Sequence, residues 1–235
     1  MSESEGHKGL IGGDLELRAR LSRVPPIVHP LVLAPFRTDG DDAALRAFAT
    51  EPLPGQTQAS QLHIEIGFGR PYYLLALAAR NPNDRILGFE IKRDWVRVAA
   101  DRATRQGITN IRVVEGDARG HIERLIADDS VDAYHVLFPD PWWKKRHHKR
   151  RVFNAEFVAL LVRTLEPGGL LVLKTDVEAY ADQVREDLAE HAALVLAGTG
   201  TADPILAALP ASHREGKCIE LGVPVFRLRF TKVAP

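Results

Sequence analysis

Residues 62–69 read LHIEIGFG, in which apolar and polar residues alternate and then give way to two glycines. Residues 72–79, YYLLALAA, are apolar and suited to a helix. Glycine at positions 67 and 69 lets the backbone turn sharply and approach a ligand closely at the start of that helix. The stretch therefore predicts a strand, a glycine turn and a helix, with a ligand site at the turn.

Two residues beside this turn argue against a dinucleotide ligand. The dinucleotide fingerprint requires a third glycine at the position where this chain has Tyr72. Glu65 lies just before the first glycine, where a carboxylate would repel phosphate and attract a cation. We therefore expect a cofactor that brings positive charge, not pyrophosphate, to the turn.

Two further acids follow runs that have the pattern of strands. Residues 85–90, RILGFE, end in Glu90, at the distance from the glycines where an acid commonly binds ribose hydroxyls. Residues 110–117, NIRVVEGD, end in Asp117, which is placed to accept a hydrogen bond from the amino group of an adenine. Both acids are expected on the same edge of a parallel sheet.

A fourth acid, Asp140, lies in the most distinctive stretch of the chain, LFPDPWWKKRHHKRR at residues 137–151. The two prolines that flank Asp140 end a strand, because proline donates no ladder hydrogen bond. Any one acid at a strand end is typical of a turn or a helix cap. Four at successive strand ends, with the glycines on the first, predict an acid-lined nucleoside pocket. Such a pocket suits S-adenosylmethionine, whose sulfonium and ammonium groups are both positive.

The second half of that stretch is strongly basic, with six Lys or Arg and two His in residues 144–151. The whole chain holds 31 basic and 31 acidic residues, so the rest of it is acidic, with 25 basic against 31. A charge run is commonly a solvated face or a localisation signal. Concentrated charge next to Trp142 and Trp143 favours a phosphate backbone and a stacked base, which predicts binding to RNA.

Strand and helix patterns alternate through the remainder. Residues 94–106 are helical, with Trp95 on the face expected to enter the core, and residues 154–165 and 178–193 form later helices. Residues 170–174 form a fifth strand. The alternation predicts an α/β fold with a doubly wound, mostly parallel sheet and helices on both faces.

The two ends of the chain differ from this middle part. A closing strand, expected to be antiparallel, begins at Val225, where the pattern alternates with period two. Residues 1–58 are Pro-rich and are predicted to form a partly disordered N-terminal arm. Residues 59–235 are predicted to form the folded domain.

Composition excludes several classes of protein. Cys218 is the one cysteine, so no intramolecular disulfide forms. The chain has no 18-residue apolar run, and its acidic start lacks a secretory signal's apolar segment, so we expect a cytoplasmic protein with no membrane partner. No metal site is predicted, because His147 and His148 are adjacent and lack ligand spacing.

Taken together, these motifs match a known family. The order EIGFG (65–69), GFE (88–90), DA (117–118), FPDPW with its basic run (138–151) and TD (175–176) resembles the bacterial tRNA (guanine-N7-)-methyltransferases. The resemblance implies a Rossmann-like class I methyltransferase fold. It also implies S-adenosylmethionine as methyl donor and a guanine of the tRNA variable loop as acceptor, with the enzyme a monomer or homodimer.

The resemblance also assigns roles to residues of this chain. It implies that Asp140 is catalytic, and that Lys144, Asp176, Ser212 and Glu215 hold the target nucleotide. The cofactor would be held by Glu65, Gly67, Gly69, Glu90, Asp117 and Asp140. The positive charge of the basic run implies that Lys145, Arg146, Lys149, Arg150 and Arg151 bind the RNA backbone.

The chain departs from the family pattern at a few positions. Arg70 and Pro71 follow the glycines, where small residues are usual, and Val177 replaces a tryptophan. Two other interpretations remain open at this point. One is a methyltransferase of this class that acts on another RNA or on a protein, and the other is an RNA-binding module with a degenerate cofactor pocket. A dinucleotide oxidoreductase is disfavoured by Tyr72 and Glu65.

Overall fold

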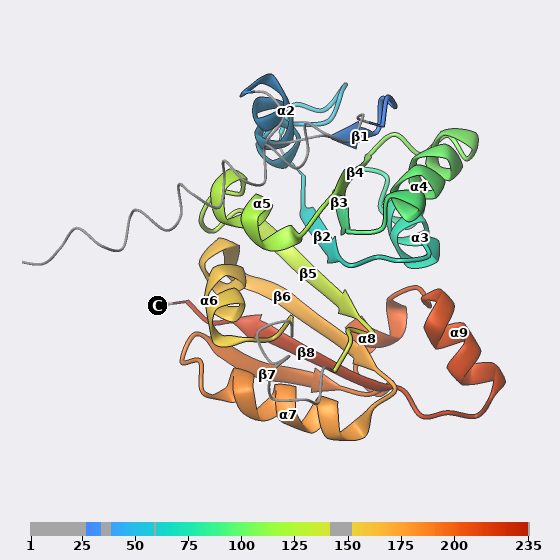
Figure 1. Ribbon diagram of the computed structural model, residues 1–235. Helices are drawn as coiled ribbons and strands as arrows, with labels where there is room; N and C mark the ends of the chain where they lie inside the picture. Colours follow the sequence, from blue (N-terminus) through green and yellow to red (C-terminus); the bar gives the residue numbers. More distant parts are fainter. Residues whose placement is uncertain (1–26, 34–38, 59, 142–151, 235) are drawn as a thin grey trace, which may run out of the picture.

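The computed structural model describes residues 27–33, 39–58, 60–141 and 152–234. Within these ranges the chain forms one eight-stranded sheet with strand order β1-β4-β3-β2-β5-β6-β8-β7 (Figure 1). The strands are β1 (Val32–Leu33), β2 (Leu62–Ile66), β3 (Arg85–Glu90), β4 (Ile111–Glu115), β5 (Val131–Leu137), β6 (Leu165–Thr175), β7 (Leu194–Thr199) and β8 (Phe226–Lys232).

The first six strands are parallel, and β8 is antiparallel both to β6 and to β7. The order reverses at β2, because β3 lies on one side of it and β5 on the other. In open α/β sheets such a switch point leaves a crevice at the carboxyl ends of the strands. The predicted α/β fold and the antiparallel closing strand are confirmed.

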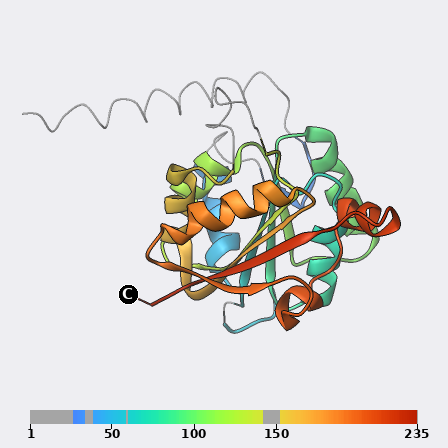
Figure 2. The same cartoon turned by 90° about the horizontal axis from the view of Figure 1, so that it is seen from below.

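Helices cover both faces of the sheet (Figures 1 and 2). One core forms beneath α2 (Asp39–Thr50), α5 (Ala118–Leu125), α6 (Ala155–Thr164) and α7 (Glu178–Ala189). The other forms beneath α3 (Tyr72–Arg80) and α4 (Arg93–Arg105). Alternate residues of one strand enter different cores, as Leu87 and Ile86 of β3 do. Two short helices, α8 (Pro204–Ala208) and α9 (His213–Glu220), connect β7 to β8.

Two predicted boundaries were wrong. β6 begins at Leu165 rather than residue 170, because Leu165 already pairs with Val131 and a register shift accommodates the residues between. The helix expected to reach residue 193 ends at Ala189, because a turn closed by the bond from Leu194 N to His191 O redirects the chain into β7.

Part of the predicted N-terminal arm packs on the sheet. β1 pairs with β4, and Leu45 of α2 is fully buried. The buried Arg85 donates hydrogen bonds to the carbonyl oxygens of Ala49 and Ser60, which ties the end of α2 to β3. The domain boundary predicted at residue 58 stays a prediction. No helix among the described residues is long and apolar enough to cross a bilayer.

Candidate active site

The predicted acids gather at the carboxyl edge of the sheet because five neighbouring parallel strands end there. Glu65 lies on β2, Glu90 ends β3, Asp117 follows β4, Asp140 follows β5 and Asp176 follows β6. Two adjoining cavities of about 500 and 510 Å³ open at this edge. They share a wall that consists of the glycine turn and the end of β5: Gly67, Gly69, Leu137, Phe138, Pro139 and Asp140.

The first cavity, here called the cofactor cavity, lies over β3 and β4. Glu90 and Asp117 line it from two strand ends, and Trp95 of α4 lines it as well. Trp95 is partly buried against the second core, as the sequence predicted, and it also lines the cofactor cavity, which the sequence did not predict. The volume of this cavity and its two acids are compatible with the predicted nucleoside without phosphate, which stays a prediction.

Glu90 fixes the conformation of the glycine turn. Its carboxylate accepts a hydrogen bond of 2.8 Å from Gly69 N and another of 2.8 Å from Lys92 N. Gly67 and Gly69 have φ values of +70° and +52°, which residues with a Cβ atom rarely adopt. Each carboxylate oxygen can accept a further bond, so Glu90 both orders the turn and remains able to bind hydroxyl groups.

Glu65 is buried, and no cation among the described residues forms an ion pair with it. Its residue surface is 2% exposed, and its Oε2 atom has no hydrogen-bond partner among the described residues. Burial raises the pKa of Glu65 well above its ordinary value, the nearby Glu90 raises it further, and Lys174 offsets the shift only in part. A buried carboxylate is costly unless a cation or donor meets it. The ammonium group of S-adenosylmethionine is such a cation, and the residues fit that cofactor.

Asp117 has two features that sequence reasoning treated as alternatives. It caps α5, because its side chain accepts a hydrogen bond of 3.0 Å from Arg119 N. It also lines the cofactor cavity, with 66% of its side chain exposed. The cap holds the carboxylate at the cavity wall, and its Oδ2 lies 3.9 Å from Arg119 Nη1.

Asp140 lies where the two cavities meet. It is exposed and lines both of them. Phe138, two residues earlier, has φ of +52°, although a residue before proline favours extended backbone. Its N–H donates a bond of 2.7 Å to the carbonyl oxygen of Lys174. Unfavourable backbone of this kind is typical of functional sites, and here it directs the Pro139–Pro141 segment over the cavities.

The second cavity, here called the acceptor cavity, extends from Glu65 and Asp140 towards β6 and α9. Asp176, Ser212, His213 and Arg214 line it on that side. Asp176 accepts a hydrogen bond of 3.0 Å from Arg214 Nε. The two carboxylates, Asp140 and Asp176, face a space that is large enough for a flat polar base.

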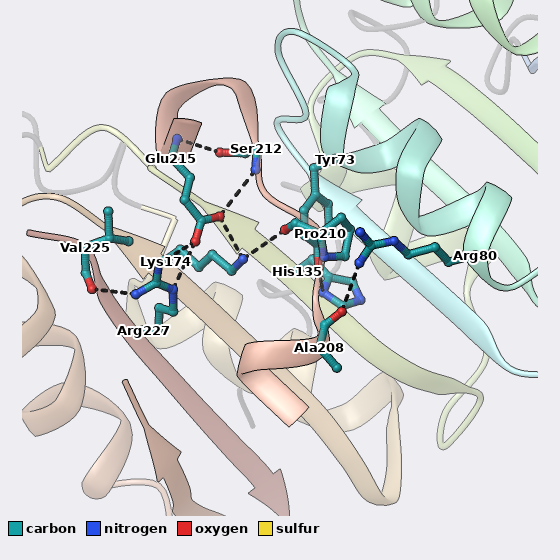
Figure 3. Close-up of polar contacts among 10 residues, drawn as sticks. All are labelled: Tyr73, Arg80, His135, Lys174, Ala208, Pro210, Ser212, Glu215, Val225 and Arg227. Carbon is teal, nitrogen blue, oxygen red and sulfur yellow. Dashed lines mark hydrogen bonds and ion pairs between the residues drawn. The ribbon is translucent and has the colours of Figure 1, made fainter. Parts of the chain in front are cut away.

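Ser212 and Glu215, which were both predicted to hold the target nucleotide, are hydrogen-bonded to each other, but only Ser212 lines the acceptor cavity. Ser212 lines the acceptor cavity and caps α9 through a hydrogen bond of 3.1 Å from Glu215 N. The Glu215 side chain is 4% exposed and does not line that cavity. Lys174 Nζ lies 2.8 Å from its Oε2, and Arg227 Nη2 lies 2.7 Å from its Oε1 (Figure 3). Glu215 therefore fixes the start of α9.

Lys174 belongs to a buried polar layer beneath the acceptor cavity. Its Nζ also donates to the carbonyl oxygen of Pro210 at 3.1 Å and lies 5.4 Å from the centre of the Tyr73 ring (Figure 3). The Tyr73 hydroxyl and His135 Nδ1 form a hydrogen bond of 2.8 Å. This layer joins α3, β5, β6 and the segment before α9, so the two sides of the cavity are held in one arrangement.

The basic run lies outside the described residues. This applies to Trp142 and Trp143 and to the six predicted RNA contacts: Lys144, Lys145, Arg146, Lys149, Arg150 and Arg151. Their roles stay predictions.

Comparison with known proteins adds independent information. A family described as "Putative methyltransferase" matches residues 59–228. The tRNA (guanine-N(7)-)-methyltransferase of Myxococcus xanthus is 36% identical over 192 residues, which cover 80% of this chain and 93% of that protein. The enzyme of the same name from Pseudomonas putida strain KT2440 is 39% identical over 171 residues, which cover 72% of this chain and 71% of that protein.

The chain belongs to the tRNA (guanine-N7-)-methyltransferase family.

Solved structures support the same fold at lower identity. The 16S rRNA methyltransferase KamB has a TM-score of 0.58 and is 16% identical, covering 84% of this chain and 94% of its own. A SAM-dependent O-methyltransferase from Thermotoga maritima has a TM-score of 0.53 and is 15% identical, covering 96% of this chain and 72% of its own. The Rossmann-like methyltransferase fold predicted from the sequence is confirmed.

Three residues of the acceptor cavity were missed by sequence reasoning about this family. Arg70, His213 and Arg214 all line it. Arg70 was noted only as a departure from a small residue, and no local pattern marked the other two. His213 and Arg70 interact across 143 positions of sequence, so no short-range signal could have paired them.

Proposed function

We propose that this chain transfers a methyl group from S-adenosylmethionine to N7 of a guanine in the variable loop of tRNA. The observation that carries the proposal is the pair of adjoining cavities that share the glycine turn and Asp140. Glu90 and Asp117 line the cofactor cavity, and Glu65 lines the acceptor cavity beside the shared wall. The acceptor cavity also has Asp140 and Asp176 and space for a base. Family membership supplies the acceptor class.

The cofactor would be held by residues at the ends of three strands, β2, β3 and β4. Glu65 would meet its ammonium group, Glu90 the ribose hydroxyls and Asp117 the adenine amino group. Bound there, S-adenosylmethionine supplies an electrophilic methyl group on a sulfonium. Gly67 and Gly69 allow the backbone to approach it without a side chain in the way.

The protein's part in the chemistry is alignment and charge stabilisation. Guanine N7 has a free lone pair at neutral pH, so no general base is needed. Holding N7 in line with the methyl group lowers the barrier by fixing orientation before reaction. Asp140 would accept hydrogen bonds from the exocyclic and ring N–H groups of the guanine, and its negative charge would stabilise the positive charge that develops on the base. Asp176 would support the same base from the β6 side.

A methyl-transfer assay with labelled S-adenosylmethionine and tRNA that lacks N7-methylguanosine tests the proposal. Cleavage chemistry specific for N7-methylguanine would then map the product to one guanine. Asp140→Ala should reduce the rate at least about 100-fold, a loss typical of one group that stabilises transition-state charge. Asp128→Ala is the matched control, because Asp128 is exposed and pairs with Arg163 outside both cavities.

Other results would favour the other two interpretations. Transfer to another atom, another RNA or a protein would keep the cofactor and change the acceptor. Tight tRNA binding without any transfer would favour an RNA-binding module with a degenerate pocket. Near-normal activity of Asp140→Ala would remove Asp140 from the catalytic role.

A further inference from the structure

Arg70 is held in a defined position at the acceptor cavity. It follows directly on Gly69, and its side chain is exposed. Its guanidinium carbon lies 5.5 Å from the centre of the Trp95 ring, within the range of a cation–π contact. Its Nη1 donates a hydrogen bond of 3.0 Å to His213 Nε2. The His213 ring in turn lies 5.4 Å from the Tyr72 ring.

No carboxylate among the described residues forms an ion pair with Arg70. By contrast, Arg214 pairs with Asp176, Arg227 with Glu215 and Arg229 with Asp203. A guanidinium has five N–H donors, and the bond to His213 uses one of them. Arg70 therefore presents a fixed positive charge with donors to spare, in a cavity whose other arginine is already neutralised.

The location of Arg70 favours an anion of the acceptor over one of the cofactor. Arg70 lines the acceptor cavity and not the cofactor cavity. Glu65 lines the acceptor cavity too, but it is buried at 2% exposure, whereas the Arg70 side chain is exposed at the surface, where an RNA strand can reach it. A guanine base has no anionic group at neutral pH, but every nucleotide of an RNA strand carries a phosphate. Guanidinium groups bind phosphate oxygens through two parallel N–H···O bonds, which fixes position as well as charge.

We propose that Arg70, held by Trp95 and His213, binds a phosphate group of the RNA strand beside the target guanine. The inference rests on the proposed function and deepens it, because it names a contact that would seat the strand with the base between Asp140 and Asp176. The departure from a small residue after the glycines then has a purpose in this chain. It adds a phosphate contact within the cavity, separate from the basic run.

The salt dependence of tRNA binding to Arg70→Ala tests this inference. Counterion release predicts that the slope of log Kd against log salt concentration falls by about 1 when one phosphate contact is lost. At low salt we expect roughly tenfold weaker tRNA binding, with the difference shrinking as salt rises. Binding of S-adenosylmethionine should be unchanged. Arg70→Lys should retain most of the slope, because it keeps the charge, but should bind less tightly because it cannot form two parallel bonds.

Arg105→Ala provides the matched control. Arg105 is an exposed arginine in the last turn of α4, and it lines neither cavity. Its removal changes the net charge by the same amount as Arg70→Ala. Because Arg105 lies outside the acceptor cavity, the slope of log Kd against log salt concentration should stay at the wild-type value. His213→Ala should give a smaller loss than Arg70→Ala, because it removes the support of Arg70 and leaves the charge.

Three results would overturn the inference. One is an Arg70→Ala slope equal to that of wild type. Another is weaker cofactor binding with unchanged tRNA binding, which would place the cofactor's carboxylate on Arg70. The third is a wild-type protein that neither binds nor methylates tRNA, which overturns the proposed function as well. The inference alone fails if the wild-type protein methylates tRNA and binds it in a salt-dependent way, and Arg70→Ala shows the same activity and the same salt dependence.

Discussion

Glu65 and Glu215 are both buried glutamates within reach of the charge of Lys174, yet their surroundings differ. Glu215 has an ion pair with Lys174 and another with Arg227. Burial alone would raise the pKa of Glu215, but the hydrogen bonds and charges of these two cations lower it below its ordinary value. Glu65 has no such partner in the part of the chain that the structure describes, and burial raises its pKa. The protein pairs the first carboxylate with its own cations, and we propose that a cationic ligand meets the second.

Removing an ion-pair partner of Glu215 should have the largest effect on stability. Lys174→Met removes one partner of a buried pair, which typically costs about 3–5 kcal/mol because a charge is left buried. Arg227 still holds Glu215, so we expect a loss near 3 kcal/mol in the free energy of unfolding. Urea denaturation monitored by tryptophan fluorescence measures it.

A double variant tests whether the loss of stability comes from the buried charge that Lys174→Met leaves on Glu215. Lys174→Met combined with Glu215→Leu removes both ions of that pair but leaves Arg227 without its carboxylate, so it should recover only part of the lost stability. If Lys174→Met is as stable as wild type, the pair does not hold α9 in place.

On the Glu65 side, Glu65→Gln should weaken cofactor binding. Loss of a bond between charged groups costs about 1.5–3 kcal/mol, which is roughly a 10- to 150-fold rise in Kd for S-adenosylmethionine. The amide has the same shape, so the glycine turn should keep its conformation. Calorimetric titration measures the affinity, with the exposed Glu123→Gln as control. Unchanged affinity for Glu65→Gln would show that Glu65 does not meet the cofactor.

The two glutamates should also give opposite dependences of stability on pH. Glu215 has a lowered pKa in the folded state, so its contribution is present above its ordinary pKa of 4.5 and is lost as pH falls through the folded value. Glu65 has a raised pKa, so cofactor-free protein loses stability as pH rises from 4.5 through the folded value.

Thermal unfolding of wild type, Glu65→Gln and Glu215→Gln from about pH 2 to about pH 8 separates these contributions. Without cofactor, Glu65→Gln should gain stability over wild type as pH rises. Glu215→Gln should be less stable than wild type at neutral pH and should approach it at the acid end. The same pH trend for both variants would contradict the comparison.

The smallest expected effect concerns the cap of α9. Ser212→Ala removes the side-chain bond to Glu215 N, and loss of an N-cap costs about 1 kcal/mol. Hydrogen exchange should quicken in α9 and remain unchanged in β2 and β3. Ser212→Thr keeps the hydroxyl and should restore protection; equal exchange in all three proteins would mean that the cap is unimportant.

The cofactor side could be predicted from the sequence because its signals are local. The glycine turn, Glu65 and Glu90 follow from strands that end within a few residues of them. Neighbouring parallel strands have their carboxyl ends on one edge of the sheet. Once the strands were predicted, the acids that follow them could therefore be placed together at that edge. The positions of Glu65, Glu90, Asp117 and Asp140 around the shared cavities followed from that rule.

The acceptor side could not be predicted in the same way. Glu215 meets Lys174 across 41 positions and Arg227 across 12, through an antiparallel strand and two short helices that carry weak patterns. Lys174 lies next to the end of an apolar strand and has no local sign of burial. The positive φ of Phe138 is likewise set by tertiary contacts, since its own residue type and the following proline disfavour it.

Proton release on binding of S-adenosylmethionine tests most directly whether Glu65 is left for a cationic ligand. Calorimetric titrations in buffers of different ionisation enthalpy, from pH 5 to 8, count the protons. Wild type should release protons on binding, because the cofactor's ammonium would favour the ionised carboxylate, and the release should fall as pH rises through the pKa of free Glu65. Glu65→Gln should lack this release. Identical proton counts for wild type and Glu65→Gln at every pH would contradict the claim.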